Sequence, residues 1–384
     1  MQEYDLVVIG GGMTGAAFAL GAGKQGKKVA LIEGVRPQPY EVTQPMDIRV
    51  SAISLASIEL LKSLQCWADI EAMRVTPYRR LETWEQPECR TTFSADDLGV
   101  DILGYMVENR LIQLGLWAQI EQQDNITLFC PDSMKTMCFS DTHNIVTLES
   151  GRELKCSLVV GADGANSNVR SCAGIGLTAW DYRQACMLIN VETEKEQQDI
   201  TWQWFTPHGP RSFLPLQGKQ GSLVWYDKPS RVRQLVAMSK EKLAEQIHTH
   251  FPSELGNVRV LQAGSFPLVR RHAQCYFKNR CVLVGDSAHT INPLAGQGVN
   301  LGFKDVKVLL EILATKEWQS EACLLAYEKR RRLDNLVMQS GMDFFYKTFS
   351  NDIAPIKFAR NAALKIANTT GPIKNKVLKY ALGL

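Results

Sequence analysis

The sequence predicts an α/β fold built around a parallel sheet, and three short segments carry this prediction. Each segment is an apolar run that ends in a glycine-containing turn, and a helical pattern follows the turn. Continuous apolar runs with β-branched residues are typical of strands that are buried on both faces, as in parallel sheets. The segments are residues 4–9 before Gly10, residues 158–160 before Gly161, and residues 281–284 before Gly285.

The first segment contains a dinucleotide-binding pattern. Gly10, Gly12 and Gly15 form G-x-G-x-x-G between the strand and a helix, and a second strand at 28–32 ends in Glu33. The first glycine permits the tight turn, the second lets the backbone approach a pyrophosphate, and the third lets the helix pack closely on the strand. The helix N-terminus attracts the phosphates, and the acid can accept hydrogen bonds from a ribose. The pattern predicts a bound nucleotide but does not separate FAD from NAD.

The other two segments are less specific when each is taken alone. Asp163 and Gly164 follow the second apolar run, and both residue types are common in ordinary turns. The third segment reads GDSAHTINPLAGQGVNLG over residues 285–302, with an Asp, a Ser and a His close together. It does not match the G-x-S-x-G turn of a hydrolase, and one turn does not supply the geometry of a catalytic triad. The G-x-x-x-x-G-K-[ST] pattern of a phosphate-binding loop is missing from the chain.

Composition and charge argue against several functional classes. The 384 residues carry a net charge of only +3, which gives no case for nucleic acid. The ten cysteines form no C-x-x-C pair, so we expect reduced thiols and no metal site. The apolar N-terminus opens with Glu3 and Asp5, unlike a signal peptide, and no apolar run reaches the ~18 residues of a membrane span. We therefore expect a cytoplasmic protein.

Together, the three motifs resemble those of the flavoprotein aromatic hydroxylases of the para-hydroxybenzoate hydroxylase type. That family combines G-x-G-x-x-G near the N-terminus, D-G in mid-chain and G-D-x-x-H-x-x-x-P late in the chain, and here the last motif runs from Gly285 to Pro293. Within this family, the chain resembles the ubiquinone-biosynthesis hydroxylases over essentially its whole length. The segments that carry this resemblance are DIRVSAISLAS (47–57), PYRRLETWE (77–85), LGYMVENRLIQ (103–113), FTPHGPRSFLPL (205–216), NPLAGQGVNLGFKDV (292–306) and QSGMDFFYKTFSN (339–351).

The resemblance implies a fold more specific than α/β alone. It implies a Rossmann-like FAD-binding domain of the para-hydroxybenzoate hydroxylase type, an inserted β-sheet substrate domain and a helical C-terminal tail. The expected boundaries are 1–76, 100–178 and 266–350 for the discontinuous FAD-binding domain, 77–99 and 179–265 for the substrate domain, and 351–384 for the tail.

The resemblance also implies a reaction. NAD(P)H, as a transient reductant without a domain of its own, reduces FAD, and a flavin C4a-hydroperoxide then transfers one oxygen atom from O₂ to a ring. The implied substrate is a polyprenylated demethoxyubiquinol in ubiquinone biosynthesis. Three alternatives stay open: a sister hydroxylase of the same pathway that acts on another ring position, a flavin reductase or oxidase of a prenylated substrate, and a non-catalytic scaffold that retains FAD.

Site residues follow from the match to the family's motifs. Asp286 is expected to bind the ribitol, Arg49 to lie near the ribityl–pyrophosphate portion, and residues 296–300 to present backbone N–H groups to the flavin. His289 is expected to be structural. The full set expected to bind the cofactor is Gly10, Gly12, Gly15, Glu33, Arg49, Asn109, Gln113, Asp163, Gly164, Asp286, Pro293, Gly296, Gln297, Gly298, Val299 and Asn300.

No side chain stands out as a dedicated catalytic acid or base. A quinol ring is already electron-rich, so positioning and exclusion of water are the main requirements. Pro293, Trp225 and Tyr226 are the candidates for shaping the ring pocket, the last two because they lie on one aromatic strand at 222–227. Aromatic residues on strands are also common in cores, and that alternative stays open.

The tail is expected to dock on a membrane surface or on a protein complex of the pathway. From Asn351 onward it carries six basic residues against Asp352 alone, with apolar residues between them. Basic amphipathic segments suit an anionic membrane surface, although a helix packed on its own domain has a similar pattern. The basic residues are Lys357, Arg360, Lys365, Lys374, Lys376 and Lys379.

Overall fold

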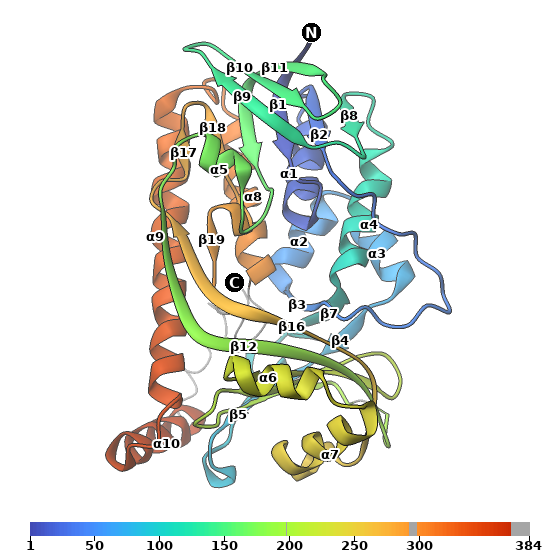
Figure 1. Ribbon diagram of the computed structural model, residues 1–384, viewed down its shortest axis with the longest axis vertical. Helices are drawn as coiled ribbons and strands as arrows, with labels where there is room; N and C mark the ends of the chain where they lie inside the picture. The colour runs from blue at the N-terminus through green and yellow to red at the C-terminus, as the bar shows by residue number, and fades with distance from the viewer. Residues whose placement is uncertain (197, 292–297, 370–384) are drawn as a thin grey trace.

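The structure is a computed structural model that describes residues 1–196, 198–291 and 298–369. Figure 1 shows two large sheets at opposite ends of an elongated molecule, and the long helix α9 (Glu321–Phe349) runs along its side from one sheet to the other. The candidate site lies between these two sheets.

The first sheet has a parallel centre with the order β17-β18-β11-β1-β2-β8, and β10 and β9 extend it from β11. Strand β1 pairs in parallel with both β2 and β11, and β11 pairs in parallel with β18. The three apolar runs are strands, as the sequence predicts, and the structure places them side by side. The strands are β1 (Gln2–Ile9), β2 (Val29–Ile32), β8 (Ile126–Phe129), β9 (Met134–Phe139), β10 (Asn144–Leu148), β11 (Glu153–Gly161), β17 (Phe277–Lys278) and β18 (Cys281–Leu283).

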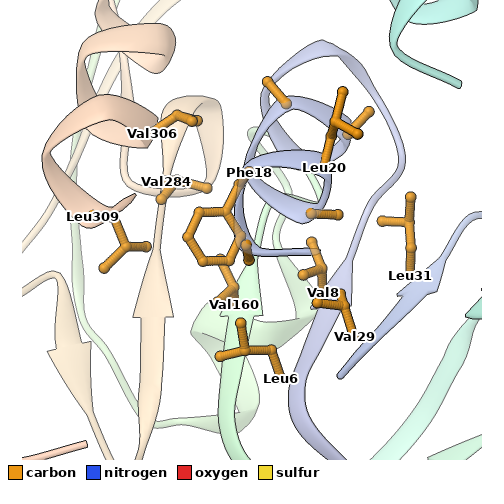
Figure 2. Packing of buried hydrophobic residues seen from close by; sticks show 14 of the residues in the cluster. Leu6, Val8, Phe18, Leu20, Val29, Leu31, Val160, Val284, Val306 and Leu309 are labelled. Atoms are coloured by element: carbon orange, nitrogen blue, oxygen red, sulfur yellow. The ribbon is translucent and has the colours of Figure 1, made fainter. Parts of the chain in front are cut away.

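Helices pack against this sheet and bury its apolar residues. Figure 2 shows Phe18 of α1 (Met13–Lys24) among Val8 and Val160 of the sheet, with Val306 of α8 (Gly298–Leu313) on its other side. All four side chains are at most 1% exposed, so burial of apolar surface stabilises this unit. The other helices of this end are α2 (Leu55–Ser63), α3 (Trp67–Met73), α4 (Asn109–Ile120) and α5 (Asn168–Cys172).

The second sheet is mostly antiparallel and has the order β19-β16-β12-β15-β14-β13-β5-β6. Its members come from four separate parts of the chain, and β13 pairs in parallel with β5. The strands are β5 (Arg80–Trp84), β6 (Thr91–Ser94), β12 (Leu177–Thr193), β13 (Ile200–Trp204), β14 (Arg211–Pro215), β15 (Gln220–Asp227), β16 (Val258–Ala273) and β19 (His289–Thr290). Strands β12 and β16 run without a break through the expected domain boundaries at 178 and 265, and those boundaries stay a prediction.

The two faces of the second sheet have different surroundings. One face packs on α6 (Pro229–Val236) and α7 (Lys240–His250), and Trp225 is fully buried there. Tyr226 clusters on the other face with Cys186 and Leu268. Successive side chains of a strand point to opposite sides, so adjacent residues of β15 belong to different clusters.

Smaller elements join the two large sheets. Strands β3 (Val50–Ser54), β7 (Gly104–Glu108) and β4 (Thr76–Tyr78) form a three-stranded sheet beneath the first. Short 3₁₀ turns complete the described fold: η1 (Pro87–Cys89), η2 (Asp96–Leu98), η3 (Ser253–Leu255) and η4 (Gly285–Ser287).

Helix α10 (Ala354–Thr369) closes the described chain and packs on the second sheet near β6. Arg360 is 4% exposed, and its Nε donates to Glu85 at 2.7 Å. Arg360 therefore points inward to a buried carboxylate from a distant segment, as in the alternative of a helix packed on its own domain, and does not contribute to a basic outer surface. Lys374, Lys376 and Lys379 lie outside the described residues. Within the described residues, no helix is both long enough and apolar enough to span a membrane.

Candidate functional site

The first glycine motif is held in place by close backbone contacts. Gly10 has φ +102°, and a Cβ atom there would lie 2.4 Å from the carbonyl oxygen of Ala162. A Cβ atom at Gly15 would lie 1.9 Å from the carbonyl oxygen of Gly10. Both distances are far below van der Waals contact, so these positions require glycine. Helix α1 can therefore begin directly at the end of β1.

All three motifs meet at this point. The backbone N–H of Val284 donates to the carbonyl of Gly161 at 3.0 Å, which joins the second and third segments. The Ser287 hydroxyl accepts from the Gly164 N–H at 3.2 Å and donates to Asp163 at 3.3 Å. Three turns that are far apart in the sequence thus form one continuous backbone surface.

Asp163 organises this surface. Its Oδ2 accepts hydrogen bonds from the backbone N–H groups of Asn168 at 2.7 Å and Val169 at 3.1 Å. These groups lie in the first turn of α5, where N–H groups have no partner within the helix. Gly164, the next residue, lines the large cavity described below.

Glu33 and Gln113 fix the middle of the glycine loop. Oε2 of Glu33 accepts from the Gly11 N–H at 2.7 Å, and Nε2 of Gln113 donates to the Gly11 carbonyl at 2.8 Å. The Trp117 indole donates to the same carbonyl at 2.8 Å. Sequence reasoning missed Trp117, although it lies four residues after Gln113 and hence on the same helix face.

Asn300 holds the first turn of α8 to β3. Its Oδ1 accepts from the Ser54 N–H at 3.0 Å and from the Ser57 hydroxyl at 2.8 Å, and its Nδ2 donates to Ala52 at 2.8 Å. The side chain is 2% exposed. Asn300 thus positions the helix whose start, at Gly298 and Val299, lines the cavity. Pro293, Gly296 and Gln297 lie outside the described residues.

His289 belongs to a buried charged network. Its Nε2 lies 2.5 Å from Oδ2 of Asp305, whose Oδ1 accepts from Arg331 Nε at 2.7 Å. Burial alone would raise the pKa of Asp305, but His289 and Arg331 outweigh it and lower the pKa to about 2. The same carboxylate accepts from the Gly285 N–H at 3.0 Å, so the network supports the third motif from behind.

A cavity of about 1270 Å³ begins at the three motifs and extends beneath the second sheet. At the motif end it is lined by Gly12, Asn109, Gly164 and Asp286. Arg49 also lines this end, with its guanidinium 5.5 Å from the Phe266 ring centre.

Asp286 is an exposed residue that lines this cavity. Although its side chain is accessible at the cavity wall, protein surrounds it, and burial raises its pKa. The charges of His289, Arg49 and Arg271 act against this shift. A carboxyl group in such a setting gains from a hydroxyl partner in the cavity, as its expected role toward a ribitol requires.

This end of the cavity fits FAD. Position 12 has no atom within 4 Å of a Cβ there, so Gly12 leaves an open cradle at the N-terminus of α1 for a diphosphate. Gly298 begins a 16-residue helix at the cavity wall, and the positive dipole end of this helix would stabilise negative charge on a reduced flavin bound there. Asp286 and Arg49, which also line this cavity, supply an acceptor and a cation.

Beneath the second sheet the cavity is largely apolar. Tyr226 lines it and is 1% exposed, and its hydroxyl has no hydrogen-bond partner among the described residues. Burial raises the pKa of Tyr226 well above its usual range, so the phenol remains a donor. Trp225 does not line the cavity: its indole donates to Asp227 at 3.2 Å within the opposite face. The expectation that both aromatic residues shape the ring pocket is therefore corrected, because a strand presents neighbours to opposite sides.

Comparison with known proteins agrees with this geometry. Residues 3–339 match the family described as FAD binding domain. The chain is 49% identical to 3-demethoxyubiquinol 3-hydroxylase of Escherichia coli (strain K12), over 100% of this chain and 99% of that protein. It is 31% identical to the mitochondrial ubiquinone biosynthesis monooxygenase COQ6 of Homo sapiens, over 98% of this chain and 92% of that protein.

Solved structures agree on the fold. The crystal structure of p-nitrophenol 4-monooxygenase PnpA from Pseudomonas putida DLL-E4 has a TM-score of 0.82 at 21% identity, with 100% of this chain and 99% of that chain covered. PqsL from Pseudomonas aeruginosa, described as a probable FAD-dependent monooxygenase, has a TM-score of 0.77 at 19% identity, over 94% of this chain and 99% of that chain. The expected combination of a Rossmann-like FAD-binding part with a β-sheet substrate part is confirmed.

Proposed function

Because the chain belongs to the FAD-binding monooxygenase family that includes the ubiquinone-biosynthesis hydroxylases, we propose that it hydroxylates the ring of a polyprenylated demethoxyubiquinol. The name of the Escherichia coli relative, at 49% identity over the full chain, supports this choice of substrate. The structural observation that carries the proposal is the continuous cavity. It joins the three cofactor motifs to a largely apolar sheet face that carries the buried Tyr226 hydroxyl, which has no hydrogen-bond partner among the described residues.

When bound, FAD takes electrons from NAD(P)H and activates O₂, and the protein supplies binding, orientation and shielding. In our proposal, Arg49 and Asp286 hold the cofactor between the starts of α1 and α8. The Tyr226 hydroxyl donates a hydrogen bond to a ring oxygen of the quinol and fixes which ring carbon faces the flavin. The apolar sheet face around it excludes water, which limits loss of the activated oxygen.

Purified protein loaded with FAD tests the proposal directly. We expect NAD(P)H oxidation that depends on a demethoxyubiquinol analogue, with one hydroxylated product formed per O₂ consumed. Product without incorporation of oxygen from ¹⁸O₂ would indicate a flavin reductase or oxidase instead. FAD that neither NAD(P)H nor substrate can turn over would indicate a scaffold.

Deletion of the gene in its host tests the ring position. Mass spectrometry of the quinone pool should then show accumulated demethoxyubiquinone. Accumulation of an intermediate that lacks a substituent at another ring position would assign the chain to a sister hydroxylase. An unchanged quinone pool would contradict a role in the pathway.

The proposal extends to where the protein works. The end of α9 and the start of α10 expose Phe344, Ile353 and Phe358, each at least 55% accessible, and Lys347 lies on the same stretch. We propose that this surface contacts a membrane or a partner protein of the pathway, as expected for the tail. Co-sedimentation with anionic vesicles, compared with neutral vesicles, tests whether this surface binds a membrane. A Phe358→Ser variant should lose such binding.

A further inference from the structure

One face of the second sheet forms a long wall of the cavity. Six adjacent strands, from β12 to β6, each contribute a pair of residues two positions apart, as expected for side chains on one face of a sheet, and β13 also contributes Trp202. These pairs are Cys186 and Leu188, Val224 and Tyr226, Ser212 and Leu214, Thr201 and Gln203, Leu81 and Thr83, and Thr91 and Phe93.

This wall is longer than a ring requires. Strands in a sheet lie about 4.8 Å apart, so six strands span about 24 Å. Tyr226 lies toward the end near the cofactor motifs, and β6 lies at the far end beside α10. A single aromatic ring held near Tyr226 would leave most of this wall uncovered.

The far end is apolar and fixed. Phe205 and Phe349 stack with ring centres 4.2 Å apart, and Leu364 completes their cluster. Thr91 donates to the Leu364 carbonyl at 2.9 Å, which joins β6 to α10. Because these groups are buried, the end of the cavity has a defined shape.

Helix α10 is anchored at this end by a buried ionic group. Glu85 Oε2 accepts from Arg360 Nε and from Asn361 Nδ2, both at 2.7 Å. Arg360 also donates to the Thr348 carbonyl at 2.7 Å, close to the end of α9. Phe344 of α9 lines the cavity and is 68% exposed, so the cavity reaches the surface beside it.

We propose that the strip of the second sheet from β15 to β6, closed by α10, binds the apolar chain attached to the substrate ring, and that this chain leaves the protein beside Phe344. This inference rests on the proposed function, because it takes a ring held near the flavin as its starting point. The ligand class is an unsaturated or saturated hydrocarbon chain, which the apolar wall binds by burial rather than by hydrogen bonds. Helix α10 is then part of the binding site.

Chain length provides the test. The FAD-loaded protein is titrated, by flavin fluorescence and by calorimetry, with methoxy-methyl-benzoquinols that carry a methyl group or one, two or three isoprene units. We expect affinity to rise on the order of tenfold for each isoprene unit until the strip is filled. The readout is the ratio of the dissociation constants for the methyl and the longest analogue.

Two variants narrow the strip at different distances from the ring. Thr83→Phe fills the cavity side of β5 without breaking a hydrogen bond among the described residues, since the Thr83 hydroxyl is buried there without a partner. Ala359→Trp narrows the α10 end. We expect Thr83→Phe to lower the ratio of the two dissociation constants at least about tenfold. Ala359→Trp should reduce only the increase in affinity that the third isoprene unit gives. Thr136→Phe, at an exposed position of β9 in the other sheet, is the matched control and should keep the wild-type ratio.

The outcomes separate this inference from the proposed function. Equal affinity for all chain lengths would contradict binding of the chain by the strip, even if every analogue is hydroxylated. Equal ratios of dissociation constants in the wild type and both variants would contradict it as well. Chain-dependent binding without hydroxylation of any analogue leaves the strip standing and overturns the proposed function. Binding of no analogue overturns both. If Thr83→Phe does not retain FAD, Ala359→Trp, at an exposed position, still allows the ratio of dissociation constants to be compared with that of the wild type.

Discussion

The two sheets shape the cavity in different ways. At the first sheet, backbone atoms of separate segments approach so closely that Gly15 has no room for a Cβ atom. At the second sheet, much of the cavity wall is made of side chains at alternate positions of six strands, from β12 to β6. Backbone contacts restrict residue type at fixed positions, whereas a side-chain wall needs only apolar character and approximate size. The cofactor end can therefore be recognised by a sequence motif with fixed residue types. The substrate end shows only cavity-facing side chains at every second position of its strands.

The largest expected effect lies at the cofactor end. Gly15→Val places atoms within the carbonyl of Gly10 and should lower the free energy of unfolding by at least about 4 kcal/mol, with loss of bound FAD. Flavin absorbance of the purified protein and thermal melting measure both effects. Gly34→Val is the matched control, because no atom lies within 4 Å of a Cβ there. A Gly15→Val protein that keeps FAD would contradict the role given to backbone contacts.

The second effect concerns the anchor of α10. Arg360→Met leaves the buried Glu85 carboxylate without its cation and should lower the free energy of unfolding by about 3–5 kcal/mol. Urea unfolding measures this change. The double variant Arg360→Met with Glu85→Leu should regain most of the loss, since no buried charge is then left alone. Lys357→Met removes only an exposed ion pair with Asp352 and should leave the melting temperature nearly unchanged.

A third pair of variants separates the two faces of β15. Tyr226→Phe should leave unfolding nearly unchanged, because the lost hydroxyl has no partner among the described residues, and should weaken substrate binding about fivefold to tenfold. Trp225→Phe should lower the free energy of unfolding by about 1–3 kcal/mol with little change in substrate affinity. Unfolding curves and substrate titrations of both variants give the comparison. The reverse pattern would place the substrate on the other face of the sheet.

The smallest effect concerns the junction of the two regions, where His272 of β16 pairs with His289 of β19. Burial, assisted by the charge of His289, lowers the pKa of His272 from 6.5 to about 4. Between these pH values the unfolded chain binds a proton that the folded protein does not, so stability falls as the pH falls from 6.5 toward 4. We expect a loss on the order of 1 kcal/mol after allowance for solvent screening.

His272→Gln isolates this contribution. Urea midpoints at pH 7.5 and pH 5 should differ less in the variant than in the wild type. Equal pH dependence in both proteins would show that His272 takes up its proton with an ordinary pKa, and that the junction is less buried than the structure indicates.

The sequence predicted β1, β11 and β18 as strands, because each apolar run ends in a turn of recognisable composition, but it did not predict that they are neighbours. It missed partners that meet only after folding. Asn300 binds Ser54, which lies 246 positions earlier, and no local pattern links them. Asp305 and Arg331 support the third motif from helices that look like ordinary amphipathic segments.

Arg360 shows the same limit from the opposite direction. A basic residue in an amphipathic tail is usually expected on the surface. Glu85, 275 positions away in the chain, turns it inward. The side of a helix that a charge occupies thus depends on a tertiary partner, which charge patterning along one segment does not reveal.

The close packing of Gly302 and Gly285 on Thr14 also sets the order of events during synthesis. The start of the glycine loop leaves the ribosome early, but the residues that complete its surroundings follow almost three hundred positions later. At about 5–20 residues per second, this interval lasts on the order of 15 to 60 s. During it, β1 gains β2 and later β11 as partners, but α1 still lacks α8. The nascent chain must therefore hold an incomplete parallel sheet until nearly its whole length has been translated, and it can acquire FAD only afterwards.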